Sequence, residues 1–254
     1  MNSACRVDLL THSQARERLA ARPAVILPLG GCEPFGHIGR IGIETLCAER
    51  ISDELSIRCR ALSAPPLPFG CSTPFISFPG AAGVKPRTFV NTLCEIIHAY
   101  ALQGATRVFL INAAPFNKAP AEEAAKRIEA KYGGVRVLLF DINTIIDRAS
   151  TALNRRIDRA DTALLAMAAY LDQESVNADI SGINADKRKN VSGEQYRAWK
   201  KRGADPQKLR KLFPDGLLLP PDNEGSIDIT PRRGKELFDR VMEFIREQME
   251  AALL

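Results

Sequence analysis

The sequence contains no apolar run near the roughly 20 residues that a membrane-spanning helix needs. Its N-terminal segment also has no apolar signal-peptide core, so we expect a soluble, cytoplasmic protein without a membrane partner. None of its six cysteines forms a C-x-x-C pair, which argues against a zinc ribbon or a redox dithiol. The sequence also lacks a G-x-S-x-G elbow, a P-loop and a G-x-G-x-x-G turn. It therefore has no motif for a serine nucleophile of this type, for P-loop phosphate binding or for dinucleotide binding.

What is present is the pattern of an α/β protein. The chain has 254 residues, 45% of them hydrophobic, which is enough for one domain over residues 1–254 with a real core. Apolar strands without polar alternation, separated by helices, predict a mainly parallel sheet flanked by helices on both faces. Extended segments are expected at 24–29, 60–68, 107–112 and 135–140. Helices are expected at 7–20, 43–55, 88–102, 120–132, 161–171 and 234–252, and loops at 74–83 and 214–228.

Positive charge is concentrated in one segment. Residues 187–211 contain ten Lys and Arg against Glu194 and Asp205, so the segment carries +8 and the rest of the +5 chain carries −3. This basic insert can be a solvated surface, a lid over an anionic substrate, or a docking surface for an acidic protein partner. Only Tyr196 and Trp199 could stack on bases within it, so we expect no nucleic-acid partner.

The first apolar strand ends in a glycine turn that carries reactive side chains. Residues 24–29 are followed by Gly30 and Gly31, and loops at the carboxyl ends of such strands commonly hold functional residues. The residues delivered there are Cys32, Glu33, His37 and Glu44. A nucleophilic group of Cys32, His37 and Glu33 is one hypothesis for them.

Five blocks of the sequence point to a family. They are EPFGHIGRIGIE (33–44), PPLPFGCSTPFISFPGAAGVKPRTF (65–89), LINAAPFN (110–117), DRADTALL (158–165) and EGSIDITPRRGKELF (224–238). In this order they resemble the creatininase (creatinine amidohydrolase) family. Its motifs are E-x-H-G-x-H-x-P-x-G-T-D, P-P-x-x-Y-G-x-S-x-x-H-x-x-F-P-G-T-x-x-x-x-P-x-T, V-N-G-H-G-G-N, E-T-S and G-D-P-x-x-A-T-x-x-x-G. The resemblance implies a creatininase-like α/β fold, a hexameric homo-oligomer and hydrolysis of a small amide by two bound metals.

Carried across by position, the family's metal ligands are mostly replaced. Glu33 stands at the glutamate, Glu44 at the bridging aspartate and Asp161 at the last acidic ligand. The family's histidines correspond to apolar residues: Phe35, Ile38, Phe75 and Ala114. We therefore expect a degenerate dinuclear site without a cofactor, which binds a small molecule or supports a catalytic partner. The expected pocket residues are Cys32, Phe35, His37, Phe75, Ala114, Phe116 and Asn117.

A second hypothesis keeps an enzyme. Glu33, Glu44 and Asp161, with or without His37, would hold a single divalent cation (Zn, Mn, Fe or Mg). Without a cation they would act as acid and base on a small cyclic amide or amidine. Carboxylates so close together repel one another, so one of them would take up a proton. Otherwise a cation would have to neutralise them, and the two nearby in sequence are Arg40 and Lys118.

Overall fold

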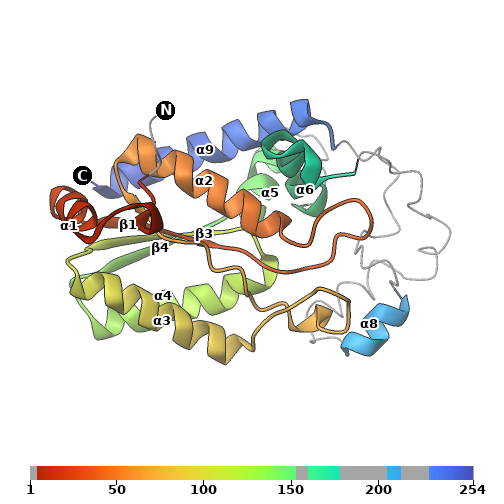
Figure 1. Cartoon of the computed structure of the whole chain (residues 1–254), viewed down its shortest axis with the longest axis horizontal. Helices are drawn as coiled ribbons and strands as arrows, with labels where there is room; N and C mark the ends of the chain where they lie inside the picture. Colours follow the sequence, from red (N-terminus) through yellow and green to blue (C-terminus); the bar gives the residue numbers. More distant parts are fainter. Residues whose placement is uncertain (1–4, 153–159, 178–204, 213–228, 254) are drawn as a thin grey trace.

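The computed structural model describes residues 5–152, 160–177, 205–212 and 229–253. A parallel four-stranded sheet with strand order β2-β1-β3-β4 runs through its centre (Figure 1). The strands are β1 (Ala24–Leu29), β2 (Leu62–Ser63), β3 (Arg107–Asn112) and β4 (Arg136–Asp141). Because the strands are parallel, all their carboxyl ends meet at one edge, called here the carboxyl edge.

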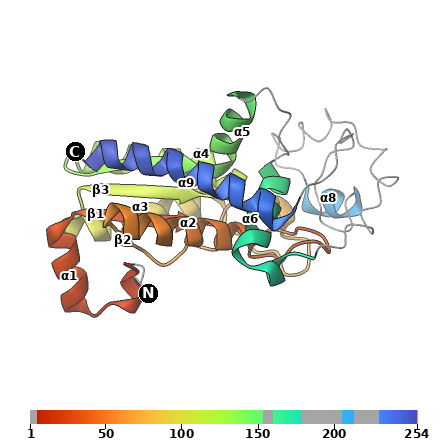
Figure 2. The ribbon, with the colours of Figure 1, turned by 90° about the horizontal axis from the view of Figure 1, so that it is seen from above.

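Helices cover both faces of this sheet (Figures 1 and 2). One face carries α2 (Ile43–Cys59), α6 (Ala160–Leu171) and α9 (Pro231–Leu253), and the other carries α3 (Pro86–Leu102) and α4 (Lys118–Lys131). The predicted parallel sheet with helices on both faces is therefore confirmed.

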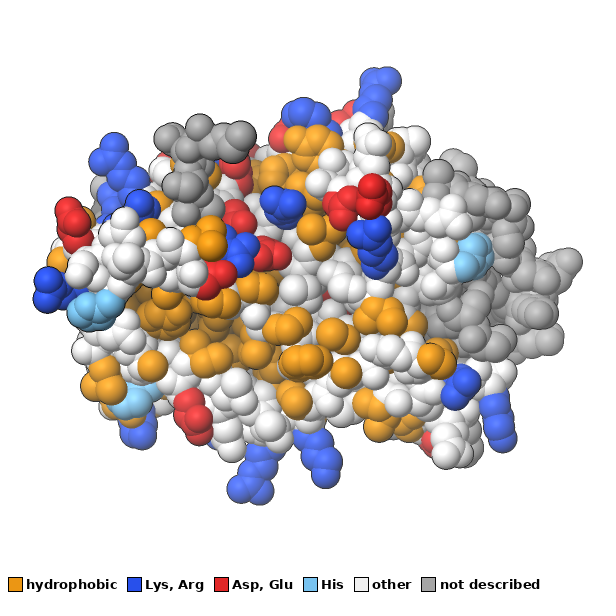
Figure 3. Space-filling view, in the orientation of Figure 1, with side chains coloured by type: hydrophobic (Ala, Val, Ile, Leu, Met, Phe, Trp, Pro, Cys, Tyr) orange, Lys and Arg blue, Asp and Glu red, His pale blue; other side chains and the backbone are white. Residues whose placement is uncertain are grey.

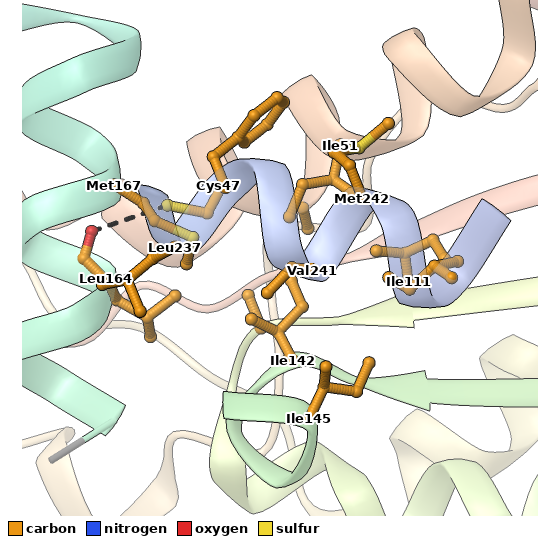
Figure 4. Close-up of a cluster of buried hydrophobic side chains, with 14 of the residues drawn as sticks. Cys47, Ile51, Ile111, Ile142, Ile145, Leu164, Met167, Leu237, Val241 and Met242 are labelled. Carbon is orange, nitrogen blue, oxygen red and sulfur yellow. Dashed lines mark hydrogen bonds between the residues drawn. The ribbon is translucent and has the colours of Figure 1, made fainter. Parts of the chain in front are cut away.

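Strand side chains alternate between two apolar clusters. Phe109 and Ile111 point to the cluster under α2, α6 and α9, whereas Val108 and Leu110 point to the cluster under α3 and α4. Figure 4 shows the first cluster, in which the thiol of Cys47 from α2 donates to the carbonyl of Leu164 from α6. A strand buried on both sides must be apolar at every position, which is why β1 and β3 are continuous hydrophobic runs.

The front of the molecule carries the sheet's short edge strand. β2 pairs with β1 over only two positions. The proline-rich segment after β2 continues beside β1, where Leu67 bridges to Leu29. In Figure 3 apolar side chains gather across the middle of this face, between α2 and α3. None of the helices in the described ranges combines the length and apolar content that crossing a bilayer requires.

Two expectations about helices need correction. The helix predicted at 7–20 is split into a 3-10 turn, η1 (Val7–Leu9), and α1 (His12–Ala21). The split occurs because Thr11 adopts an extended conformation and forms a capping box with Gln14. A further helix, α5 (Ile142–Ala152), was not predicted at all. The loop expected at 214–228 lies outside the described residues.

The carboxyl edge is built from short turns. These are η2 (Thr73–Phe75), η3 (Pro115–Asn117) and η4 (Gln173–Ser175), together with the glycine turn after β1. A short helix, α8 (Pro206–Leu212), lies at the same end of the molecule (Figure 1). The turns after β1 and β3 and the loop of Cys71 and Ser72 therefore meet at one end of the sheet.

Candidate functional site

Glu33 and Glu44 are both buried at the carboxyl edge. Glu33 is 6% exposed, and the hydroxyl of Ser72 donates to its Oε1 at 3.0 Å. Glu44, in the first turn of α2, is 1% exposed. A Cβ added to Gly31 would lie 2.1 Å from Glu44 Oε2 and 3.3 Å from the Cβ of Ala114. The missing side chain at Gly31 thus makes room for the Glu44 carboxylate beside Ala114.

Asn117 joins two loops of this edge. Its Nδ2 donates to the carbonyl of Gly30 at 2.8 Å, and its Oδ1 accepts from the backbone amide of Cys71 at 2.7 Å. A Cβ on Gly70 would lie 2.5 Å from Asn117 Oδ1, so the loop can approach this closely only with glycine there. Both ends of the buried amide are used within the protein, which makes Asn117 a brace between the glycine turn and the Cys71 loop.

The residues that the resemblance places at the family's histidine positions are buried and apolar. Phe35 and Ile38 belong to the cluster under α2, α6 and α9. Phe75 instead packs edge-to-face on Phe116, with ring centroids 5.7 Å apart and planes at 77°. Ala114 is fully buried after β3. Phe35 and the Phe75–Phe116 pair therefore lie in two different packing groups rather than along a single wall.

His37 and Cys32 lie near Glu33 in sequence but differ in surroundings. His37 is exposed on a turn in which Gly36 has a φ of 62°, whereas Glu33 is buried. The Cys32 thiol is partly buried and donates to the carbonyl of Pro68 at 3.4 Å. Burial, and then the charge of Glu33, raises the pKa of Cys32. A thiol with a raised pKa keeps its proton at neutral pH, which disfavours a nucleophilic thiolate here.

The two cations considered for the carboxylates have partners elsewhere. Arg40 makes exposed ion pairs with Asp172 and Glu174, at 3.3 and 3.5 Å. The ammonium group of Lys118 donates to Thr144 Oγ1 at 2.8 Å. These contacts tie the Gly36 turn to the segment after α6, and α4 to α5.

A polar network that the sequence did not indicate supports Ala114. Asn112 and Asp141 are the last residues of β3 and β4 and are partners in the sheet register. Asn112 Nδ2 donates to Asp141 Oδ2 at 2.7 Å and to the carbonyl of Ala114 at 2.9 Å. The other oxygen of Asp141 accepts from the amide and the hydroxyl of Thr144 and so caps α5. The signal available in the sequence was that a polar residue, Asn112 or Asp141, ends each of these two adjacent apolar strands.

The described residues do not fit a two-metal centre. Nowhere in these ranges do three or more His, Cys, Asp or Glu side chains form a group that could hold a metal ion. Glu33 and Glu44 remain, but Phe35, Phe75 and Ala114 offer no lone pair to a cation. Asp161 lies in the first turn of α6. Its side chain, like residues 187–204 of the basic insert, is outside the described part of the chain.

Comparison with known proteins identifies one family and two related hydrolases. The sequence profile of the family described as Creatininase, creatinine amidohydrolase, matches residues 8–249. A 3-dehydro-scyllo-inosose hydrolase of Thermotoga maritima is 28% identical over 105 residues, 41% of this chain and 33% of that protein. A creatinine amidohydrolase of Pseudomonas putida is 30% identical over 118 residues, 44% of this chain and 45% of that protein. The chain thus spans less than half the length of these curated relatives.

Solved structures show the same fold over nearly the whole chain. A crystal structure of a creatinine amidohydrolase superposes with a TM-score of 0.76 at 17% identity and covers 98% of both chains. A creatininase described as a manganese form has a TM-score of 0.74 at 17% identity, covering 98% of this chain and 99% of that chain. A mutant creatininase described as a zinc–zinc form gives 0.75 at 17% identity and covers 99% of each. At these identities the likeness concerns the fold alone.

Proposed function

The chain belongs to the creatininase family, and from this premise we propose that it binds a small metabolite at the carboxyl edge without the family's two-metal centre. The observation that carries the proposal is the set of buried apolar residues at the histidine positions, Phe35, Ile38, Phe75 and Ala114. Zinc and similar borderline metals take imidazole nitrogen together with carboxylate oxygen. Without imidazoles at these four positions, too few donors remain to hold two cations.

The apolar side chains at the histidine positions would stabilise the fold by packing instead of by binding metal. A buried phenylalanine stabilises a protein by about 1.5–3 kcal/mol relative to an exposed one. An edge-to-face pair such as Phe75 and Phe116 adds about 0.5–1.5 kcal/mol beyond that burial. On this proposal the carboxyl edge is ordered by side-chain packing and by the Asn117 brace rather than by metal.

The first experiment is metal analysis of protein purified without chelators. We expect substoichiometric zinc, manganese and iron, and near-stoichiometric metal would contradict the proposal. The Phe35→His, Phe75→His and Ala114→His triple variant adds imidazoles at three of the four positions. It is expected to bind zinc more tightly than the parent in a calorimetric titration.

The second experiment tests ligand binding by calorimetry. The probes are creatinine, other small cyclic amides and amidines, and 3-dehydro-scyllo-inosose, the compound named for one relative. Glu33→Gln is expected to weaken binding of the active probe by about tenfold, the effect of one charge-assisted hydrogen bond. Glu95→Gln, an exposed position on α3, is the matched control. Equal affinity in both variants would remove Glu33 from the site.

A second candidate function is amide hydrolysis at a carboxylate site. It is favoured by the survival of Glu33 and Glu44 as buried acids at two of the family's ligand positions. With Asp161 they would hold one divalent cation, with His37 as a further ligand, or they would act as acid and base without metal. Turnover of a cyclic amide that depends on Mg²⁺ or Mn²⁺ and is lost in Glu44→Gln would support it. Full activity in Glu44→Gln would exclude it.

Assembly and partners are part of the proposal. By family resemblance we propose a homo-oligomer, hexameric in form, which mass photometry can measure. The basic insert at 187–211 is proposed as the contact for a catalytic or acidic protein partner, because it carries a net charge of +8 whereas the rest of the chain carries −3. Unchanged oligomeric state and partner binding after deletion of this segment would remove that role.

A further inference from the structure

Ser77, in the loop after η2, makes two hydrogen bonds with helix α8. The hydroxyl of Ser77 donates to the carbonyl of Pro206 at 2.6 Å, and the guanidinium of Arg210 donates to the carbonyl of Ser77 at 2.9 Å. Both ends of α8 are thus bound to one residue that lies far away in sequence. This pair of contacts is called here the Ser77 clasp.

The Ser77 clasp bonds α8 to a loop that contributes to the candidate site. Two residues before Ser77, η2 contributes Phe75, which is 3% exposed and packs on Phe116. The same loop begins with Cys71 and Ser72, and Ser72 donates to Glu33. α8 and η2 lie together at the strand-end tip of the molecule (Figures 1 and 2). A movement of α8 would therefore act directly on the loop that donates a hydrogen bond to Glu33.

The clasp is weak compared with the fold beneath it. α8 has seven residues, which is too short for a helix to be stable in water without tertiary contacts. Arg210 is exposed, so water competes for its hydrogen bond to Ser77. Release of α8 consequently requires far less free energy than unfolding of the sheet, as is usual for elements that open locally.

We propose that α8 is a closing element for the carboxyl edge, and that opening of the Ser77 clasp exposes the loop from Cys71 to Ser77. The role concerns access to the site and does not depend on which small molecule binds there. Closed, α8 holds η2 and with it the loop whose Ser72 donates to Glu33. Open, it leaves the loop free to admit solvent and ligand.

Alkylation of cysteines, mapped by mass spectrometry, tests this in the intact protein. Cys71 is 3% exposed and burial raises its pKa to about 12, so its reaction at mildly alkaline pH depends on opening of the loop. Cys94, which donates to the carbonyl of Ala124 between α3 and α4, reports on a distant part of the same molecule.

Ser77→Ala and Arg210→Gln each remove one half of the clasp. Both are expected to raise the alkylation rate of Cys71 by about tenfold, the effect of losing one hydrogen bond of ordinary strength, with no change at Cys94. Lys211→Gln is the control, since it removes the same charge from the next residue of α8 and leaves the clasp in place. A Cys71 rate that stays at the parent value in both variants would overturn the proposal. A parallel rise at Cys71 and Cys94 would also overturn it, because that is general loosening.

Discussion

At the scale of single residues, Asn117 links two loops by hydrogen bonds, a role that its position in the chain does not suggest. Its amide donates to Gly30 and accepts from Cys71, and it is fully buried. This side chain bonds two loops from different strands, and Gly70 lets them approach closely around it. A buried group that loses its partner costs about 1–3 kcal/mol, which is more than the bond itself contributes.

Asn117→Ala is therefore expected to lower the free energy of unfolding by about 2–4 kcal/mol, because it removes the side chain that bonds the Gly30 carbonyl and the Cys71 amide. Urea unfolding followed by circular dichroism measures the change. Asn91→Ala, at an exposed position on α3, should change stability by no more than about 0.5 kcal/mol. A similar small loss in Asn117→Ala would show that the loops meet without the brace.

The thiol of Cys71 makes stability sensitive to alkaline pH. Burial, and then the charge of Glu33, raises its pKa to about 12, against about 8.5 for an unfolded cysteine. The folded state thus favours the neutral thiol. Its contribution is complete below the unfolded pKa and is lost as the pH rises towards the folded value. The free energy of unfolding should fall from about pH 9 upward for this reason.

Cys71→Ala removes that titration. Its unfolding free energy is expected to decline less steeply than the parent's above about pH 9, while the difference between the two stays constant from about pH 6 to 8. Urea unfolding across this range measures both slopes. Identical alkaline slopes would mean that the buried thiol does not control the loss.

At the scale of elements, α6 and α9 cross at a glycine. A Cβ on Gly234 would lie 1.9 Å from the carbonyl oxygen of Ala166 and 2.9 Å from the Cβ of Tyr170. The oxygen belongs to backbone, so it cannot move aside as a side chain could. The glycine therefore sets how closely α9 lies on α6, and with it the position of the helix that carries Asp161.

Gly234→Ala is expected to lower the free energy of unfolding by about 3 kcal/mol, because the two helices must separate. The thermal midpoint, measured by calorimetry, reports the loss. Gly134→Ala serves as the matched change, since a Cβ there meets no heavy atom within 4 Å, and it should be nearly neutral. Equal midpoints for the two variants would contradict the tight crossing.

At the scale of the whole molecule, the proposed lack of a two-metal centre has a consequence for what stabilises the fold. A ligand that binds only the folded state stabilises it by mass action, by about 2.7 kcal/mol at 100 times its dissociation constant. Removing a tightly held metal pair from a chain of this size would lower the thermal midpoint by about 5–10 °C. Packing of Phe35, Phe75 and Phe116 contributes to the same edge without any cation.

Dialysis against a chelator is accordingly expected to leave the thermal midpoint within about 1 °C of the starting protein. Scanning calorimetry before and after dialysis measures this. A fall of several degrees that added zinc or manganese restores would show that metal holds the fold together, and the proposed function would then need revision.

Much of the fold was accessible from sequence. The bounds of β1 and β3 agree with the prediction, and the helices along α2, α3, α4 and α9 differ only at their ends. α5 was missed because its N-cap, Asp141, is the last residue of an apolar strand. The same carboxylate bonds Asn112 on the neighbouring strand, a partner visible only once the two strands are in register.

The amino-acid sequence alone specified the layered architecture and the apolar residues that the resemblance places at the family's histidine positions. Apolar periodicity and residue identity are local properties, and each can be read within a few positions. The tertiary structure decided which distant residues meet. Glu44 lies beside Ala114 and Gly31, Asn117 bonds two loops, and Ser77 bonds α8. These contacts depend on the lengths and crossings of whole elements, which no local pattern of residues records.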